Sequence, residues 1–567
     1  MVENALSLKR LIRPPGGETA LETGPWRANP FHRAKLGEGA CDDVLAYAED
    51  PRVGDLARGR EIGSGIWRIG AERIAGQHDS PWDQPLPSRH FAARLHAFSW
   101  LNDLSAIGRA SEPYIAFLID EWVSRFGQWD EFAWDPELTA ERLYAWLAWG
   151  RPAFEQSDPA ARNALLQTAA RQARLLMLSH NELGDRRLGA IKAGAALVLA
   201  GAAGFPDGDA FAAQGEEILL EAFAKQFLPD GGHCSRSPEA HAEALYDYIT
   251  ANSALSYLHG VSVFQDILAK LANMARLFRL GDGALGCFHG GSEGSAASLD
   301  AALSRVPQGV RPFQFATHTA FQRLEAGDMR LLFDVGAAPP YAYAERAHAS
   351  ALSFEMSSRR ERLIVNVGAA RDLSPAARHA ARATNGHSTL ILNDALSAAL
   401  EAPRRGKGPA RLVGPTLDDV RRSSDESGVT LQGRHDGYKN QYGLLHRRYL
   451  FADHAGRNLR GIDELIRPMK IKSPNPKEPI PFVARFHLHP SVRTRLLDPR
   501  TALLETPGGE RWRLRTDASD IQVAPSVYWG GQSSEETQQL VLHGKADPMG
   551  HGLGPPNRIR WALTRAD

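Results

Sequence analysis

The chain has 567 residues, of which 43% are hydrophobic and 23% are charged. These proportions are typical of a soluble globular protein, and the length is too great for one ordinary core. Its 66 basic and 66 acidic side chains cancel, and no nucleic-acid-binding motif accompanies them, so we expect no nucleic acid as a partner.

Other bulk features exclude further classes. No apolar run approaches the ~20 residues that a membrane-spanning helix needs. Three cysteines, Cys41, Cys234 and Cys287, are too few and too scattered for a disulfide framework. The first residues lack a basic segment followed by an apolar core, so we expect no secretory signal and a cytoplasmic protein.

The first half of the chain has a helical period. Apolar residues recur every three or four positions from about residue 87 to residue 280, as at Ile267, Leu271, Met274 and Phe278. Short polar or Gly/Pro-bearing breaks separate these runs. The pattern predicts antiparallel helical hairpins that form a bundle, a solenoid or a toroid.

The second half alternates with period two. Met329, Leu331, Phe333 and Val335 are the first example, and similar runs continue to the end of the chain. Many short alternating strands indicate a large antiparallel sandwich. We therefore expect an α-helical domain at 1–285, a Gly/Ser-rich linker at 286–310 and a β-domain at 311–567.

A first candidate site follows one of the predicted helices. Asp230-Gly-Gly forms a turn, which leaves His233 and Arg236 on a loop, where catalytic groups often lie. Tyr246 falls within the next predicted helix. The simpler interpretation is structural, with Arg236 paired to a carboxylate and His233 bonded to the backbone.

A second group of polar residues lies in the β half. His348 and His387 stand at the ends of strand-like runs, and Asn366 lies between them. Basic clusters also occur here, including Arg421-Arg422 and Arg447-Arg448, and the simplest interpretation of these is solvated strand edges and loops.

These segments together resemble the heparinase II/III-like polysaccharide lyases. The resemblance is carried by the Asp230-Gly-Gly-His loop with its Arg-Ser-Pro, by Phe321-Gln-Arg-Leu-Glu-Ala-Gly, by the His348 and His387 segments and by Arg485-Phe-His-Leu-His-Pro. It implies an α+β multidomain fold, in which an N-terminal incomplete (α/α) toroid precedes a C-terminal antiparallel β-sandwich. It also implies an acidic polysaccharide as the partner, and the periplasm or cell envelope as the alternative location.

The activity that the resemblance implies is β-elimination of a uronic-acid-containing glycan. Such a lyase must neutralise the uronate carboxylate and move protons at the neighbouring carbon and the leaving oxygen. We assign neutralisation to Arg236 and proton transfer to a histidine among His233, His348 and His387, with Tyr246 in reserve.

Two alternatives remain at the level of sequence. Relatives carry a Tyr where this chain has Ala240, and an Asn-His pair where it has Gly184-Asp-Arg-Arg, which favours a non-catalytic or biosynthetic glycan-binding protein on the same scaffold. A hydrolase would need paired carboxylates, for which Glu239 and Glu243 are the candidates.

The resemblance also implies a structural zinc site formed by His348, Asn366 and His387.

Overall fold

The fold was obtained as a computed structural model of the chain. It describes residues 36–37, 39, 41–76, 80–183, 188–306, 313–402, 408–468, 478–548 and 557–566. Residues 184–187, which include Gly184 and the segment that replaces the expected Asn-His, lie outside the described residues.

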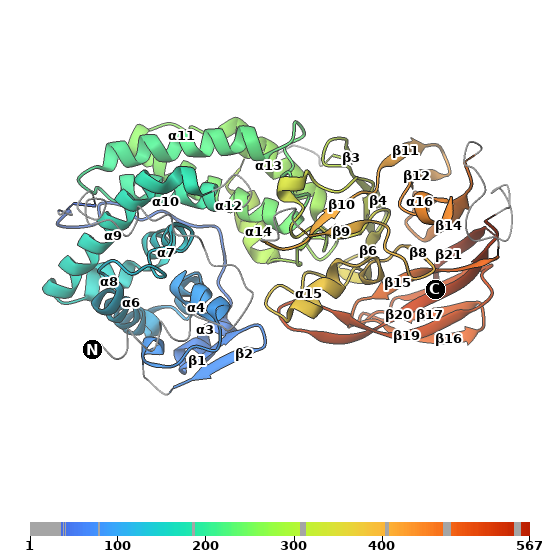
Figure 1. The fold of residues 1–567 in the computed structure, drawn as a ribbon, viewed down its shortest axis with the longest axis horizontal. Coiled ribbons are helices and arrows are strands. Elements are labelled where there is room, and N and C mark those ends of the chain that lie inside the picture. The colour runs from blue at the N-terminus through green and yellow to red at the C-terminus, as the bar shows by residue number, and fades with distance from the viewer. Residues whose placement is uncertain are drawn as a thin grey trace. The chain divides into compact units, whose positions relative to one another are not determined.

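The first 300 residues are mainly helical (Figure 1). Two of the longer helices begin alike, because Asp135 and Asp158 each accept hydrogen bonds from the first backbone N–H groups and a proline follows. Among the described residues, no helix combines the length and the hydropathy needed to cross a bilayer. The helices are α3 (Leu56–Gly63), α4 (Arg89–His96), α5 (Leu101–Ser105), α6 (Glu112–Phe126), α7 (Pro136–Trp149), α8 (Arg151–Gln156), α9 (Pro159–Ser179), α10 (Gly189–Ala202), α11 (Gly208–Gln226), α12 (Pro238–His259), α13 (Gln265–Phe278) and α14 (Ala296–Ser304).

Helices α10 and α11 pack very closely. A Cβ atom at Gly215 of α11 would lie 2.6 Å from the backbone oxygen of Gly194 in α10. Only glycine allows the two backbones to approach this far. A small hairpin of β1 (Ile66–Ile69) and β2 (Glu72–Ala75) accompanies the helices.

The rest of the chain forms antiparallel strands with two short helices, α15 (Pro375–Arg382) and α16 (Lys439–Tyr442). The strands are β3 (Phe315–Ala316), β4 (Phe321–Ala326), β5 (Met329–Asp334), β6 (Phe354–Ser358), β7 (Glu361–Val365), β8 (Leu390–Leu392), β9 (Ala399–Glu401), β10 (Arg411–Val413), β11 (Leu417–Ser424), β12 (Gly428–His435), β13 (Leu445–Asp453), β14 (Asn458–Ile466), β15 (Ile480–Leu488), β16 (Arg493–Asp498), β17 (Thr501–Glu505), β18 (Arg511–Thr516), β19 (Ile521–Tyr528), β20 (Glu535–Ala546) and β21 (Arg558–Ala566).

Two large sheets share one core. Within the described residues, the eight-stranded sheet has the order β11-β12-β13-β14-β21-β18-β17-β16, and the nine-stranded sheet contains β3–β8, β15, β19 and β20. Phe354 of β6 stacks on Trp561 of β21, with ring centroids 5.8 Å apart, inside a single apolar cluster drawn from both sheets. The mixed α+β prediction, with a helical first part and antiparallel sheets after it, is confirmed.

The chain divides into two compact units, and each unit is made of three separate segments of the sequence. Unit 1 comprises Met1–Phe227, Glu243–Ala269 and Ala297–Gln308, and unit 2 comprises Leu228–Ala242, Lys270–Ala296 and Gly309–Asp567. The division passes through α12 and α13. The segment expected as a linker contains α14, and its first part packs within unit 2.

Candidate functional site

The candidate loop after α11 is fixed within unit 2 by Asp230. The carboxylate of Asp230 accepts hydrogen bonds from the backbone N–H groups of His318 and Thr319, at 2.8 and 2.7 Å, and from the Thr319 hydroxyl. Gly232 leaves room for this contact, because a Cβ atom there would lie 1.9 Å from the hydroxyl oxygen of Thr319. The loop therefore presents Arg236 to the strands of unit 2.

Arg236 is almost fully buried, with 4% of its surface exposed. Its Nε donates to the Thr319 carbonyl at 2.8 Å, Nη1 to the Ala337 carbonyl at 2.7 Å and Nη2 to the Ala320 carbonyl at 3.1 Å. Nη2 also forms an ion pair with Asp334, the last residue of β5. Every nitrogen of the guanidinium group thus contacts a protein acceptor.

His289 joins this pair. Its Nε2 lies 3.1 Å from Nη1 of Arg236 and 3.2 Å from Oδ2 of Asp334. Burial alone would raise the pKa of Asp334, but Arg236, His289 and the Ser350 hydroxyl outweigh it and hold that pKa below its usual range. Asp334 is therefore ionised at neutral pH.

Two residues of this network have left-handed backbones. Arg236 has φ = 58° and His289 has φ = 47°. For residues with a side chain this conformation is strained, and it persists only where surrounding contacts determine it. In this network the positions of the side chains are therefore maintained at the cost of an unfavourable backbone conformation.

His348 and His387 form a directly hydrogen-bonded pair, with 3.1 Å between Nδ1 of His348 and Nε2 of His387. Nδ1 of His387 lies 2.9 Å from the Ala383 carbonyl, which can only accept, so in the neutral ring that nitrogen carries the proton. Nε2 of His387 must then accept from Nδ1 of His348. This order leaves a bare lone pair on Nε2 of His348.

Both rings are neutral at physiological pH. Burial, followed by the neighbouring His387, lowers the pKa of His348 well below its usual value. Burial likewise lowers the pKa of His387 to about 3. Within the described residues nothing donates a hydrogen bond to Nε2 of His348. Because the pKa of the ring is lowered, this nitrogen is an acceptor of low basicity.

The structure links three of the five residues predicted as catalytic. Arg236 connects through Asp334 and His289 to the backbone of His348, whose N–H lies 3.4 Å from Nδ1 of His289, and so to His387. The fourth predicted residue, His233, lies on the same loop as Arg236. Its Nδ1 is 2.7 Å from the Ser235 hydroxyl, its ring packs edge-on against Tyr343, and burial lowers its pKa to about 3.

Tyr246, the fifth predicted residue, belongs to unit 1 and not to the unit that holds the other four. It is buried on α12, where the guanidinium carbon of Arg52 lies 5.1 Å from its ring centroid. Arg52 in turn pairs with Asp247, at 2.7 Å, and with Glu243. Glu243 therefore takes part in an ion-pair cluster of unit 1, while Glu239 pairs with Arg371 in unit 2.

The residues expected to bind zinc do not fit a metal ion. The two histidine rings bond to each other, and Asn366 uses both ends of its amide: Oδ1 accepts from the Ser388 N–H at 3.0 Å and Nδ2 donates to the Cys287 carbonyl at 3.2 Å. Across the described part of the chain there is no group of three or more His, Cys, Asp and Glu side chains able to hold a metal.

Sequence reasoning missed His289 and Asp334. His289 falls in the segment expected as a linker, although the following Gly290-Gly291 indicates a tight turn, and Gly290 has φ = 75°. Asp334 ends the alternating run Met329–Asp334 at a position where the pattern expects only a strand residue. The available signal was a carboxylate at the end of a strand run, at Asp334, followed two residues later by Gly336. The lack of a side chain at Gly336 leaves room for Arg236.

Comparison with known proteins gives a consistent family. Residues 308–562 match the model of the heparinase II/III-like C-terminal domain. The chain is also 33% identical over 554 residues, 96% of its own length and 94% of the relative's, to FtsZ-localized protein C of Caulobacter vibrioides (strain NA1000 / CB15N).

Solved structures share the fold. Heparinase III aligns with a TM-score of 0.65 at 14% identity, covering 99% of this chain and 89% of that one. A mutant of the heparan sulfate lyase HepC from Pedobacter heparinus aligns with a TM-score of 0.60, also at 14% identity, over 95% of this chain and 87% of that one. At this identity the likeness concerns the fold alone.

Proposed function

Because this chain belongs to the heparinase II/III-like family, we propose that it uses the polysaccharide-lyase scaffold to bind an acidic glycan without cleaving it. The family and the fold support a polysaccharide as the partner. The finer choice, binding without cleavage, rests on the chemical state of the candidate residues.

The observation that carries this proposal is the complete engagement of Arg236. A lyase needs a donor or cation directed at the charge that develops on the uronate. Arg236 instead directs its nitrogens to three backbone carbonyls and to Asp334, with His289 against Nη1. Moving it toward a substrate would leave the buried, charged Asp334 without its guanidinium counter-ion, which costs about 3–5 kcal/mol.

The histidine pair supports the same choice. Efficient proton transfer requires a group whose pKa lies near the working pH. The pKa of His387 lies at about 3 and that of His348 is also far below its usual value, so neither ring takes up a second proton and becomes charged at pH 7. Nε2 of His348 is suited to accept a hydrogen bond from a sugar hydroxyl.

Uronate polymers test the proposal directly. We expect polygalacturonate to bind the full chain in calorimetry and to yield no ultraviolet absorbance of unsaturated uronate. Replacing His348 by Ala should weaken any binding that this site provides. Steady formation of unsaturated ends by the wild-type chain, lost in His348→Ala, would contradict binding without cleavage.

The relative's name adds a location. We infer that this chain, like FtsZ-localized protein C, is found with FtsZ, because the similarity extends over nearly the full length of both chains. A fluorescently tagged copy expressed in Caulobacter vibrioides beside labelled FtsZ is expected to show coincident signals. A diffuse signal from a stable, full-length fusion would refute the inference.

A second candidate function is β-elimination by the same site. The fixed tautomer of His348 favours it, since Nε2 has a free lone pair and the proton on Nδ1 is held by His387. In that case Nε2 of His348 would take the proton from the carbon beside the uronate carboxylate, a double bond would form to the next carbon as its bond to the glycosidic oxygen breaks, and the imidazolium would return the proton to that oxygen. Arg236 would act through Asp334 and His289 as a positioning residue. The absorbance measurement above separates the two candidates.

A further inference from the structure

The outer face of the eight-stranded sheet carries an unusual concentration of arginine. Strand residues alternate between faces, so side chains opposite the apolar core point outward. On strands β12, β13, β14, β16, β18 and β21 the outward cations are all arginines, and most of them alternate with buried residues. They are Arg434, Arg447, Arg460, Arg493, Arg495, Arg511, Arg513, Arg515, Arg558 and Arg560, together called the arginine face.

Only part of this charge is neutralised locally. Arg434 pairs with Asp418 at 2.7 Å, Arg447 with Glu464 at 2.7 Å and Arg560 with Asp517 at 2.7 Å. Within the described residues the other members have no ion pair, and they extend across the sheet from β14 to β16. They are Arg460, Arg493, Arg495, Arg511, Arg513, Arg515 and Arg558.

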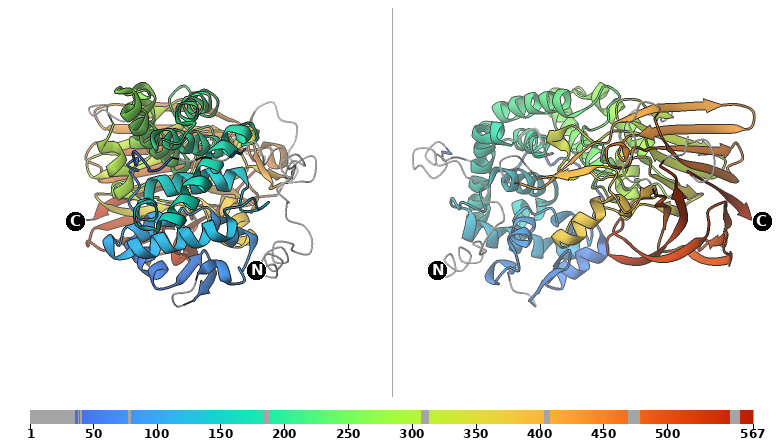
Figure 2. Two further views of the ribbon diagram at one scale, coloured as in Figure 1. Left: turned by 90° about the vertical axis from the view of Figure 1, so that its left-hand side faces the viewer. Right: turned by 45° about the vertical axis from the view of Figure 1, so that its right-hand side comes forward.

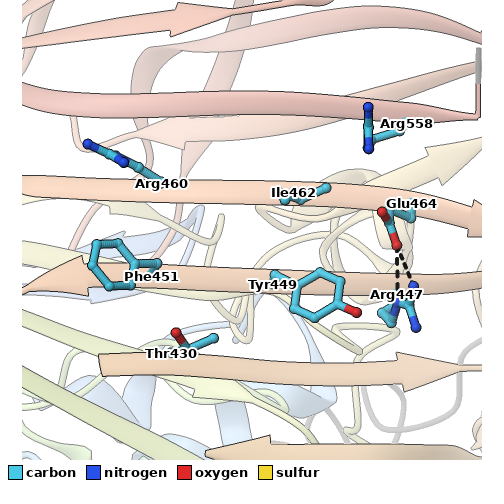
Figure 3. Close-up of a pocket in the computed structure, with 8 residues that line it drawn as sticks. All are labelled: Thr430, Arg447, Tyr449, Phe451, Arg460, Ile462, Glu464 and Arg558. Carbon is cyan, nitrogen blue, oxygen red and sulfur yellow. Dashed lines mark hydrogen bonds and ion pairs between the residues drawn. The ribbon is translucent and has the colours of Figure 1, made fainter. Parts of the chain in front are cut away.

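A groove of about 620 Å³ lies at one end of the arginine face. Its floor contains Tyr449 and Phe451 of β13, and Arg460 and Arg558 border it. Figure 3 shows the two aromatic rings side by side with their broad faces toward the viewer. The Nε atom of Arg558 is buried and has no hydrogen-bond partner among the residues that the structure describes, which leaves a donor without an acceptor at the edge of the groove.

We propose that the arginine face and this groove bind an acidic glycan chain, as a surface separate from the His348 site. Guanidinium groups match carboxylates and sulfates in bidentate fashion. The flat faces of Tyr449 and Phe451 offer apolar surface to the C–H face of a sugar ring. At ~4.8 Å per strand, the four steps from Arg460 on β14 to Arg495 on β16 span about 19 Å, which suits an extended chain.

Carboxylates within the face favour a glycan over other polyanions. Glu464 lines the groove, and Glu505 lies opposite Arg511 and Arg493 in the strand register. A polyphosphate or a DNA strand has no hydroxyl groups along its chain to donate to these carboxylates and would be repelled there. A glycan can place hydroxyl donors against these carboxylates and its acidic groups against the arginines.

The strands themselves argue against a peptide. Strands β13, β14, β21 and β18 are each paired on both sides, so an added peptide strand finds no free backbone groups. The sheet also twists, by roughly 20° between neighbouring strands, and Figure 2 shows β21, the dark red strand that leads to the C-terminus, at an angle to the orange strands of the same sheet. A flexible chain follows such a surface, whereas a planar bilayer contacts only part of it.

Binding of the full chain to defined probes tests the proposal. The probes are a polygalacturonate oligomer, neutral dextran, polyglutamate and vesicles containing phosphatidylglycerol, measured by calorimetry at low and high NaCl. The double variant Arg460→Glu/Arg558→Glu should weaken polygalacturonate binding about tenfold or more, because it reverses two charges beside the groove. Arg460→Gln/Arg558→Gln provides the same test should the charge reversal impair folding.

The aromatic variant separates stacking from charge alone. Tyr449→Ala/Phe451→Ala should also weaken polygalacturonate binding about tenfold while leaving the salt dependence unchanged. The matched control, Arg68→Glu/Arg151→Glu, removes two exposed arginines of unit 1 and should have no effect.

Three results would overturn the proposal. One is unchanged polygalacturonate binding in the arginine variants; if His348→Ala abolishes that binding, the proposed function stands and this inference alone fails. Another is equal binding of polyglutamate or vesicles with no effect of the aromatic variant, which would make the face a general anion surface. The third is equal binding of dextran.

Discussion

Removing the charge of Asp334 tests the network on which the site depends. In Asp334→Asn, Arg236 loses its counter-ion. Water cannot replace it, because the side chain of Arg236 is only 5% exposed and that of Asp334 is 0% exposed. Removing one partner of a buried ion pair costs about 3–5 kcal/mol of the free energy of unfolding. With a urea dependence of about 3 kcal/mol per molar, the unfolding midpoint of unit 2 should fall by about 1–1.7 M.

The assay is urea unfolding followed by tryptophan fluorescence, with Trp512 and Trp561 buried in the sandwich core as reporters. Asp418→Asn is the matched control, since Asp418 pairs with Arg434 in the same unit but is 59% exposed, and it should change stability by less than ~1 kcal/mol. Equal shifts in the two variants would refute the view that the Arg236–Asp334 pair is a buried, stabilising contact.

Three further predictions concern the same region. Gly336→Ala should destabilise unit 2 by about 1–3 kcal/mol in urea unfolding, because its Cβ would lie 2.1 Å from Nη2 of Arg236. The control Gly531→Ala should be neutral, because the atom nearest to its Cβ would lie 3.6 Å away, and equal effects of the two variants would contradict this prediction. His387 is neutral when folded, with a pKa of about 3, but takes up a proton when unfolded near pH 6.5, so this residue should account for a loss of about 2 kcal/mol of stability between pH 7 and pH 5. Other buried histidines such as His233 and His348 add losses of the same sign, so in His387→Gln the fall should be smaller than in the wild type by about 2 kcal/mol, and an unchanged slope would disprove the assignment. Nitrogen NMR shifts of His348 should report a proton on Nδ1 and none on Nε2 at pH 7, and the reverse tautomer would be inconsistent with the His348–His387 bond.

The fold class followed from the sequence because its signal is periodic. Apolar spacing of three and four residues marked the helices, and alternation such as Phe482, Ala484, Phe486 and Leu488 marked strands that do face a core. The compact units were beyond this reasoning. Periodicity identifies elements, but it does not reveal that the loop containing Arg236 packs with strands about a hundred residues later.

The candidate site was predicted in part. Arg236, His348 and His387 stood out as polar residues on loops and strand ends, and the structure joins them in one network. Asp334 and His289, which connect them, were hidden because each looks like an ordinary residue of a strand end or a linker. Burial decided the chemistry: the same side chains would be acids, bases or cations in water, and are here neutral or paired.

The most direct test of the central claim is to follow unsaturated uronate absorbance and polygalacturonate binding on one sample of the full chain. The account predicts saturable binding with no growth of absorbance. Absorbance that increases with enzyme concentration and disappears in His348→Ala would contradict it and establish a lyase.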